Sequence, residues 1–316
     1  MSDKVPPGKP PSRFVLFAPF VAIVLGMVVL SLIWAVVRTR ALTEIEARAG
    51  TLRAQGYQVS WTKLEPSGFP FRLRLRFEGV KVVSPAGFSL SSDRIEALTL
   101  AYAPDHWVIS TDAPLRLGRP QGGDVLVKAD RALASLSDCD KPVWRMALDL
   151  ENAVFTPVAG AAPFSLDRAG RLTIETRQSP ANADDAEALV RWENARVSRT
   201  GSLALLGPDH LYSGGLALRL TSFIEFQGTG WSSAGRRWVR EGGEFEVDPV
   251  DPPASEIGLG TPGSTFLFDK SGYGTGELSL DLRAKGEKVF HTLVVKLDKD
   301  GAFFGGKKLG PSPRFF

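Results

Sequence analysis

The sequence predicts a mainly β protein with an N-terminal transmembrane helix followed by an extended, curved antiparallel sheet built from successive hairpins. Three observations indicate this fold class. An uncharged apolar run lies near the N-terminus, a stretch of strict two-residue alternation follows it, and the abundant Gly (32) and Pro (22) separate a long series of strand-like runs.

The apolar run begins at Phe14 and ends at Val37 without a charged residue. It exceeds the ~20 residues that a helix needs to cross the hydrocarbon core of a membrane. A cleaved signal peptide has a shorter apolar region followed by small residues, whereas this run ends near Trp34 and is followed by Arg38 and Arg40. We therefore expect a retained anchor at 14–37; a helix buried in a soluble core is the alternative.

The flanks of this run complete the expected N-terminal organisation. Residues 1–13 are rich in Pro and predict a disordered cytosolic stub. Residues 38–56 place apolar side chains at helical spacing up to Gly56 and predict an amphipathic stalk helix. Basic residues lie on both sides of the run in similar number, but a long C-terminal domain translocates largely regardless of flanking charge. We therefore expect the N-terminus inside and residues 57–316, the β domain, outside.

The clearest strand signal follows Pro70. Two-residue alternation puts successive side chains on opposite faces of a sheet. It therefore predicts one apolar face and one basic face for this strand. The expected apolar face consists of Phe71, Leu73, Leu75 and Phe77, opposite Arg72, Arg74 and Arg76.

Other strand-like runs continue to the C-terminus, with Pro and Gly chiefly between them. The predicted runs are 88–102, 107–117, 124–136, 143–155, 171–176, 188–197, 216–226, 237–247, 265–268, 276–282 and 288–297. Residues 247–263 are rich in Pro, Gly and Asp and predict a surface loop or a short helical connector. Residues 299–301 predict a hairpin turn.

A weak internal repeat links three of these regions. Phe77-Glu78-Gly79, Leu150-Glu151-Asn152 and Trp192-Glu193-Asn194 each place a large apolar residue before Glu and then Gly or Asn. Gly and Asn tolerate backbone angles that other residues avoid, so the repeat predicts a recurring bulge or tight turn. Chance similarity among hairpins is the alternative.

Composition excludes some functions. The 38 basic and 35 acidic residues are interspersed and give a formal net charge of +3, whereas nucleic-acid-binding proteins concentrate Lys and Arg on one face or in a tail. We therefore expect no nucleic-acid partner. Cys139 is the only cysteine and cannot form an internal disulfide.

Catalytic and metal-binding motifs are scarce, and we predict no catalytic residue, no metal site and no cofactor. His106 and His210 each occur in Pro-Asp-His, which is ordinary turn chemistry, so a metal site formed by two such turns is the weaker interpretation. Carboxylate pairs such as Asp184 with Asp185 lie in polar loops, where solvated charge is the default explanation.

The stalk is followed by Gly56-Tyr57 and then by Gly68-Phe69-Pro70-Phe71-Arg72-Leu73; near the C-terminus, Asp300-Gly301 precedes Leu309-Gly310-Pro311-Ser312-Pro313. Together these features resemble the bacterial domain-of-unknown-function family 2125. Gly-Phe-Pro before an alternating strand is also similar to AsmA-like envelope proteins. The resemblance implies a Gram-negative inner-membrane anchor, a periplasmic domain and a long, curved, groove-like sheet, and it carries over no catalytic residue.

Three functions follow from these expectations. The first is an envelope protein that binds or conducts lipid or another amphiphile in an apolar groove, with Phe71, Leu73, Leu75 and Phe77 as candidate groove residues. The second is a scaffold that recruits envelope proteins and whose sheet is closed by its own core. The third is a membrane-anchored hydrolase that uses acidic loop residues. We favour them in that order.

Overall fold

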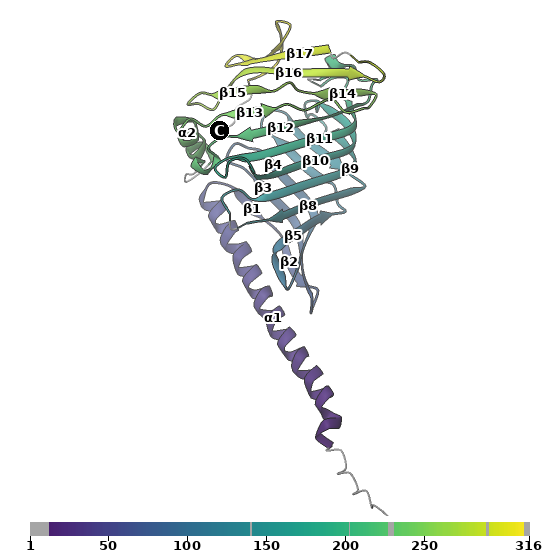
Figure 1. The fold of residues 1–316 in the computed structure, drawn as a ribbon, viewed down its shortest axis with the longest axis vertical. Helices are drawn as coiled ribbons and strands as arrows, with labels where there is room; N and C mark the ends of the chain where they lie inside the picture. The colour runs from purple at the N-terminus through teal and green to yellow at the C-terminus, as the bar shows by residue number, and fades with distance from the viewer. Residues whose placement is uncertain (1–12, 140, 202, 227–230, 289–290, 313–316) are drawn as a thin grey trace, which may run out of the picture.

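The computed structural model describes residues 13–139, 141–201, 203–226, 231–288 and 291–312. Figure 1 shows a single long helix, α1 (Arg13–Ala54), that projects from one end of a large β-sheet. The mainly β fold class, with one long apolar N-terminal helix and a sheet of successive hairpins, is thereby confirmed. The predicted stub lies outside the described residues except for Arg13.

α1 is continuous over 42 residues, a length of roughly 63 Å at 1.5 Å per residue. Its N-terminal part has a mean hydropathy of 2.9 and no buried residues in its most apolar window, so the helix is long and apolar enough to cross a membrane. The helix ends where Gly56 adopts a φ of +90° and the N–H of Tyr57 donates to the carbonyl of Leu52 at 3.0 Å. A left-handed glycine just past the last turn is a common helix stop.

The β domain contains nineteen strands within the described residues. They are β1 (Gln58–Ser60), β2 (Lys63–Ser67), β3 (Arg72–Val83), β4 (Ser89–Leu100), β5 (Ala103–Thr111), β6 (Leu115–Arg119), β7 (Gly123–Lys128), β8 (Arg131–Ser137), β9 (Arg145–Pro157), β10 (Leu166–Gln178), β11 (Ala186–Val197), β12 (Tyr212–Leu220), β13 (Phe245–Asp248), β14 (Ile257–Gly260), β15 (Ser264–Phe268), β16 (Gly274–Ala284), β17 (His291–Asp298), β18 (Gly301–Phe304) and β19 (Lys307–Gly310).

All of these strands belong to one sheet. β1 and β2 pair with β3, and β3 pairs with β4. β4 pairs with both β5 and β6, while β7 and β8 both pair with β9, so the sheet is two strand segments wide in this region. From β9 to β12 each strand pairs with the next, and β16 to β19 continue the sheet to its far edge. Figure 1 shows β3 and β4 at the level of β9 to β12 but farther from the viewer, because the sheet curves over itself.

Several predicted strands differ from the observed ones. The runs predicted at 107–117 and 124–136 are each two strands, separated at Asp112–Pro114 and at Ala129–Asp130. The first break arises because Thr111 Oγ accepts a hydrogen bond from the N–H of Ala113 at 3.0 Å and Pro114 has no N–H to donate. The predicted loop at 247–263 contains β14, whereas the predicted hairpin turn at 299–301 is confirmed by the pairing of β17 with β18.

The largest local error concerns residues 237–247, which were predicted to be a strand. Helix α2 (Trp231–Arg240) occupies the first part, and β13 begins only at Phe245. Ala234 and Trp238, four residues apart, are both buried, which is helical rather than strand spacing. Similarly, the run predicted at 216–226 ends as a strand at Leu220, and a 3-10 turn, η2 (Phe223–Glu225), follows.

The internal repeat has a structural counterpart. Gly79, Asn152 and Asn194 have positive φ values of 60°, 50° and 50°, so the predicted unusual backbone angle is confirmed at all three positions. In each copy neither the Glu nor the Gly or Asn is buried, and the apolar face resumes one residue out of phase. A left-handed residue bends the strand and increases its twist locally. The repeat therefore keeps apolar side chains on one face while the sheet bends.

Candidate functional site

One line of apolar side chains crosses eight strands of the sheet. Strand register pairs each member directly with the next, so all of them lie on the same face, which we name the apolar face. The members of this apolar row, from β3 to β12, are Leu75, Ala97, Ile109, Ala134, Leu148, Ile174, Val190 and Leu216. A parallel line on the same face contains Trp107, Leu136, Met146, Thr176, Ala188 and Leu218.

The two ends of the apolar row differ in burial. Leu75 and Ala97 are buried, whereas the six members from Ile109 onward are only half-buried. Met146, in the parallel line, is 44% exposed. Ile109 packs against the Leu73–Leu75 cluster and Leu148 against a cluster around Val125 and Leu150, so these members are partly covered by the protein itself. An apolar surface that stays partly accessible can mark an interaction site.

The C-terminal half of α1 covers the first part of the apolar face. Leu73 and Leu75 are both fully buried. The helix side chains that pack on this cluster are Trp34, Val37, Ala41, Leu42 and Ile45. A hydrogen bond from Trp34 Nε1 to the carbonyl of Arg72, at 2.9 Å, fixes the helix against the start of β3.

Further along α1, the guanidinium of Arg48 lies 5.1 Å from the ring centre of Trp144, which precedes β9. This cation–π contact joins the helix to the strand region that contains the accessible part of the row. α1 therefore contacts the sheet at β3 and again close to β9.

The opposite face of the same strands carries ion pairs. Arg76 donates two hydrogen bonds to Glu96, at 3.0 and 2.8 Å, between β3 and β4. Arg171 of β10 donates to both oxygens of Asp149 on β9, at 2.9 and 3.0 Å. These hydrogen bonds hold the pKa of Asp149 below its usual value. The opposite face thus combines charged pairs with apolar side chains such as Leu98, Val108 and Leu189, whereas the apolar row has no charged member.

The four groove residues expected from the sequence have different surroundings. Leu73 and Leu75 lie beneath α1, and Phe77 packs in the same cluster while its ring meets Trp61 edge-to-face at 5.8 Å. Phe71 lies in the turn before β3 and is 58% exposed. The structure therefore brings Leu73, Leu75 and Phe77 together and separates Phe71 from them.

The accessible members of the row, on β5 and β8 to β12, were not singled out from the sequence. Alternation within 188–197 and 171–176 was a usable signal for which side chains share a face. The register between strands that are far apart in the chain could not be predicted, because it depends on strand pairing that no local sequence pattern determines.

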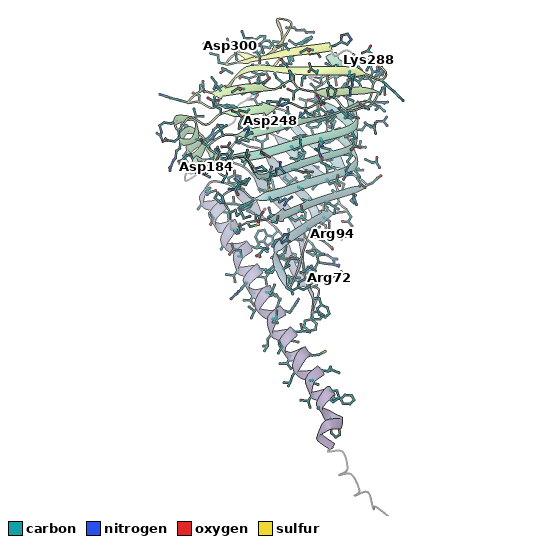
Figure 2. The ribbon with its side chains drawn as sticks, in the orientation of Figure 1. Arg72, Arg94, Asp184, Asp248, Lys288 and Asp300 are labelled. Atoms are coloured by element: carbon teal, nitrogen blue, oxygen red, sulfur yellow. The ribbon has the colours of Figure 1, made fainter. Side chains whose placement is uncertain are left out.

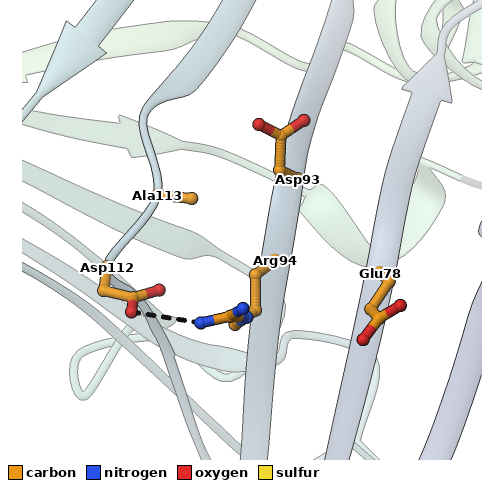
Figure 3. A pocket seen from close by; sticks show the side chains of 5 residues that line it. All are labelled: Glu78, Asp93, Arg94, Asp112 and Ala113. Carbon is orange, nitrogen blue, oxygen red and sulfur yellow. Dashed lines mark hydrogen bonds and ion pairs between the residues drawn. The ribbon is translucent and has the colours of Figure 1, made fainter.

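A polar hollow of about 440 Å³ lies where β5 gives way to β6. Figure 3 shows the carboxylates of Glu78 and Asp93 around it, with Arg94 directed at Asp112. The Arg94–Asp112 contact measures 3.5 Å and both side chains are exposed. The hollow is thus lined by exposed charge. Within the described residues no group of three or more His, Cys, Asp or Glu side chains that could hold a metal ion occurs.

Two carboxylates, that of Asp185 from the pair considered above and that of Asp248 at the end of β13, have structural partners. Asp185 is buried and accepts hydrogen bonds from the N–H of Ser222, at 2.9 Å, and from Asn182, at 3.0 Å. Asp248 accepts a hydrogen bond from Arg219 at 2.9 Å. Both groups therefore tie neighbouring segments together.

Fold and site together define the class: a mainly β protein with one curved sheet, an apolar face, and an N-terminal helix with the dimensions of a membrane anchor. The profile of the family described as "Uncharacterized protein conserved in bacteria (DUF2125)" matches residues 34–289. The chain belongs to this family, as the sequence motifs predicted. The C-terminal motif at 300–313 lies outside the match. No curated protein and no solved structure matches the chain.

Proposed function

We propose that this protein is anchored in the inner membrane by α1 and that its β domain, in the periplasm, holds the acyl chain of a lipid or another amphiphile along the apolar face. The observation that carries the proposal is the apolar row, which has no polar member in eight successive strands. An ordinary sandwich would cover such a face with a second sheet. Here its members from Ile109 to Leu216 keep part of their surface accessible.

The dimensions of the row suit an extended chain. Its seven strand spacings of about 4.8 Å give a length of roughly 34 Å. The hydrocarbon core of a bilayer is about 30 Å thick and contains two leaflets, so one acyl chain occupies about half of that thickness. The row therefore exceeds the length of one acyl chain, which supports movement along it as well as binding.

The residues expected from the sequence have a place in this proposal. Leu73, Leu75 and Phe77 form the membrane-proximal start of the apolar face, beneath α1. An amphiphile that reaches the row from this side passes Phe71 and the edge of α1. The rival function is a scaffold for envelope proteins, in which the apolar face is closed by the protein's own side chains.

A site-specific crosslinking experiment separates the two functions. Cysteine is introduced in a Cys139→Ser background at Ile174, on the apolar face, or at Glu175, the exposed neighbour on the opposite face. The thiol of each variant is modified with a photoreactive maleimide in native membranes and irradiated, and adducts are identified by mass spectrometry. We expect lipid adducts for Ile174→Cys and none for Glu175→Cys.

Two controls define the other outcomes. A Leu75→Cys variant should resist modification, because that position is fully buried under α1. In spheroplasts, a membrane-impermeant maleimide should label Glu175→Cys, as the periplasmic assignment requires. If Ile174→Cys reacts only after denaturation, or gives no lipid adduct, the scaffold replaces lipid binding.

A further inference from the structure

Two neighbouring turns present exposed aromatic side chains at one end of the β domain. The turn between β2 and β3 contains Phe69 and Phe71, which are 49% and 58% exposed, and the turn between β4 and β5 contains Tyr102, which is 75% exposed. The N–H of Ala101 donates to the carbonyl of Phe71 at 2.9 Å, which holds the two turns together. The three rings therefore belong to a single surface, named here the aromatic tip.

The aromatic tip is fixed to one level of α1. The ring of Phe69 meets that of Trp34 edge-to-face, with centroids 5.6 Å apart, and Trp34 Nε1 donates to the carbonyl of Arg72 at 2.9 Å. Figure 2 shows Arg72 at the end of the β domain that faces the N-terminal part of α1. The position of Trp34 along the axis of α1 therefore determines where along that axis the aromatic tip lies.

That level coincides with the expected surface of a membrane. Twenty residues separate Phe14 from Trp34, which at 1.5 Å per residue gives roughly 30 Å, the thickness of the hydrocarbon core. Charge returns one turn later at Arg38, whose guanidinium lies 5.8 Å from the ring centre of Trp34. Trp and Tyr favour the layer between hydrocarbon and water, and long basic side chains reach from it towards headgroups.

We propose that the aromatic tip inserts into the interfacial layer of the same membrane that α1 crosses, and so docks the β domain on the lipid surface. This inference rests on the proposed membrane anchoring. The partner is the bilayer, because the tip is held beside the apolar helix at the helix's own interfacial residue. Docking places Leu73 and Leu75, the next residues of the same face, just above the lipid. The apolar face then begins at the membrane surface.

Depth measurements with spin labels test the docking. The full-length chain, in a Cys139→Ser background, is labelled at Phe71→Cys or Tyr102→Cys and reconstituted in nanodiscs of phosphatidylethanolamine and phosphatidylglycerol. Power saturation compares the accessibility of the label to oxygen, which partitions into lipid, and to a water-soluble nickel chelate. The matched control is Phe88→Cys, since Phe88 is 57% exposed in the turn at the other end of β3 and β4.

Labels at Phe71 and Tyr102 should show severalfold lower accessibility to the nickel chelate than the label at Phe88. A label at Val29→Cys, within the apolar part of α1, should be deeper still. If Val29 is deep but Phe71 and Tyr102 match Phe88, docking is wrong and the tip is a surface for something other than lipid. If Val29 is also accessible to the chelate, the anchoring itself is wrong. Lipid adducts at Ile174 report separately on the apolar face.

Discussion

The left-handed residues of the internal repeat give a quantitative test of why Asn recurs there. Asn152 on β9 and Asn194 on β11 both have a φ of 50°, and both strands pair with β10. We consider replacing each Asn by Gly, which adopts this conformation freely. The contrasting replacement is Val, whose branched side chain suits an ordinary strand but not a positive φ.

The expected magnitude follows from the local contacts. Asn152 Nδ2 donates to Asp130 at 2.9 Å, and this exposed hydrogen bond, which contributes about 0.5–1 kcal/mol, is lost in both replacements. The difference between Val and Gly is therefore the cost of forcing a left-handed backbone on a branched residue, about 1–2 kcal/mol. For a domain of this size that difference lowers Tm by roughly 2–8 °C.

Thermal unfolding of the full chain in detergent, followed by circular dichroism, measures the effect. Asn152→Val should unfold at a lower temperature than Asn152→Gly, and the same order should hold at Asn194. The two sites are two strands, or roughly 10 Å, apart, so the double Val variant should lose about the sum of the single effects. Thr173→Val, at a regular position of β10, is the control and should change Tm little. Val variants as stable as the Gly variants would refute the conformational argument.

Two further predictions concern opposite faces of the sheet. Leu73→Asp places an unpaired carboxylate at a fully buried position and should lower the free energy of unfolding by several kcal/mol. Arg74→Gln removes only a 3.8 Å surface ion pair and should change the free energy of unfolding by less than about 1 kcal/mol. Equal losses of stability for the two variants in thermal unfolding would contradict the assignment of faces. The pKa of Asp149 is lowered by its hydrogen bonds to Arg171, so its stabilising effect is present above the unfolded pKa of about 3.9 and is lost as pH falls through the lower folded value. Asp149→Asn should therefore lower Tm at neutral pH and have little effect in strong acid, and a pH-independent loss would show that the ion pair is not responsible.

Features encoded in short stretches of sequence were predictable. The apolar run of α1 is visible because a membrane-spanning helix needs an uninterrupted set of apolar residues. The alternation at Leu73 and Leu75 fixed which side chains share a face. The repeated Gly79, Asn152 and Asn194 indicated unusual backbone angles, since few residue types adopt them readily.

Features that depend on distant contacts were not predictable in the same way. Alternation placed Leu73 and Leu75 on an apolar face but did not indicate that α1 covers them, because their partners Trp34 and Ile45 lie about 30 to 40 residues earlier in the chain. α2 was missed because the alternation of Glu244-Phe245-Glu246-Val247, at β13, was extended back to Arg237, although Trp238 and Val239 are adjacent apolar residues that do not fit a two-residue period. Only the burial of Trp238 against Phe245 and other aromatic rings explains the helix.

The order of the strands also determines how long the sheet is. The apolar row runs across the strands, and β19, whose only partner within the described residues is β18, forms the far edge. Lys307 and Lys308 lie on that edge strand, where charge discourages pairing with other chains. A hairpin added beyond this edge would lengthen the sheet by about 10 Å without altering the register of any existing pair. The length of such a sheet, measured from α1, is therefore adjustable in fixed steps, one hairpin at a time.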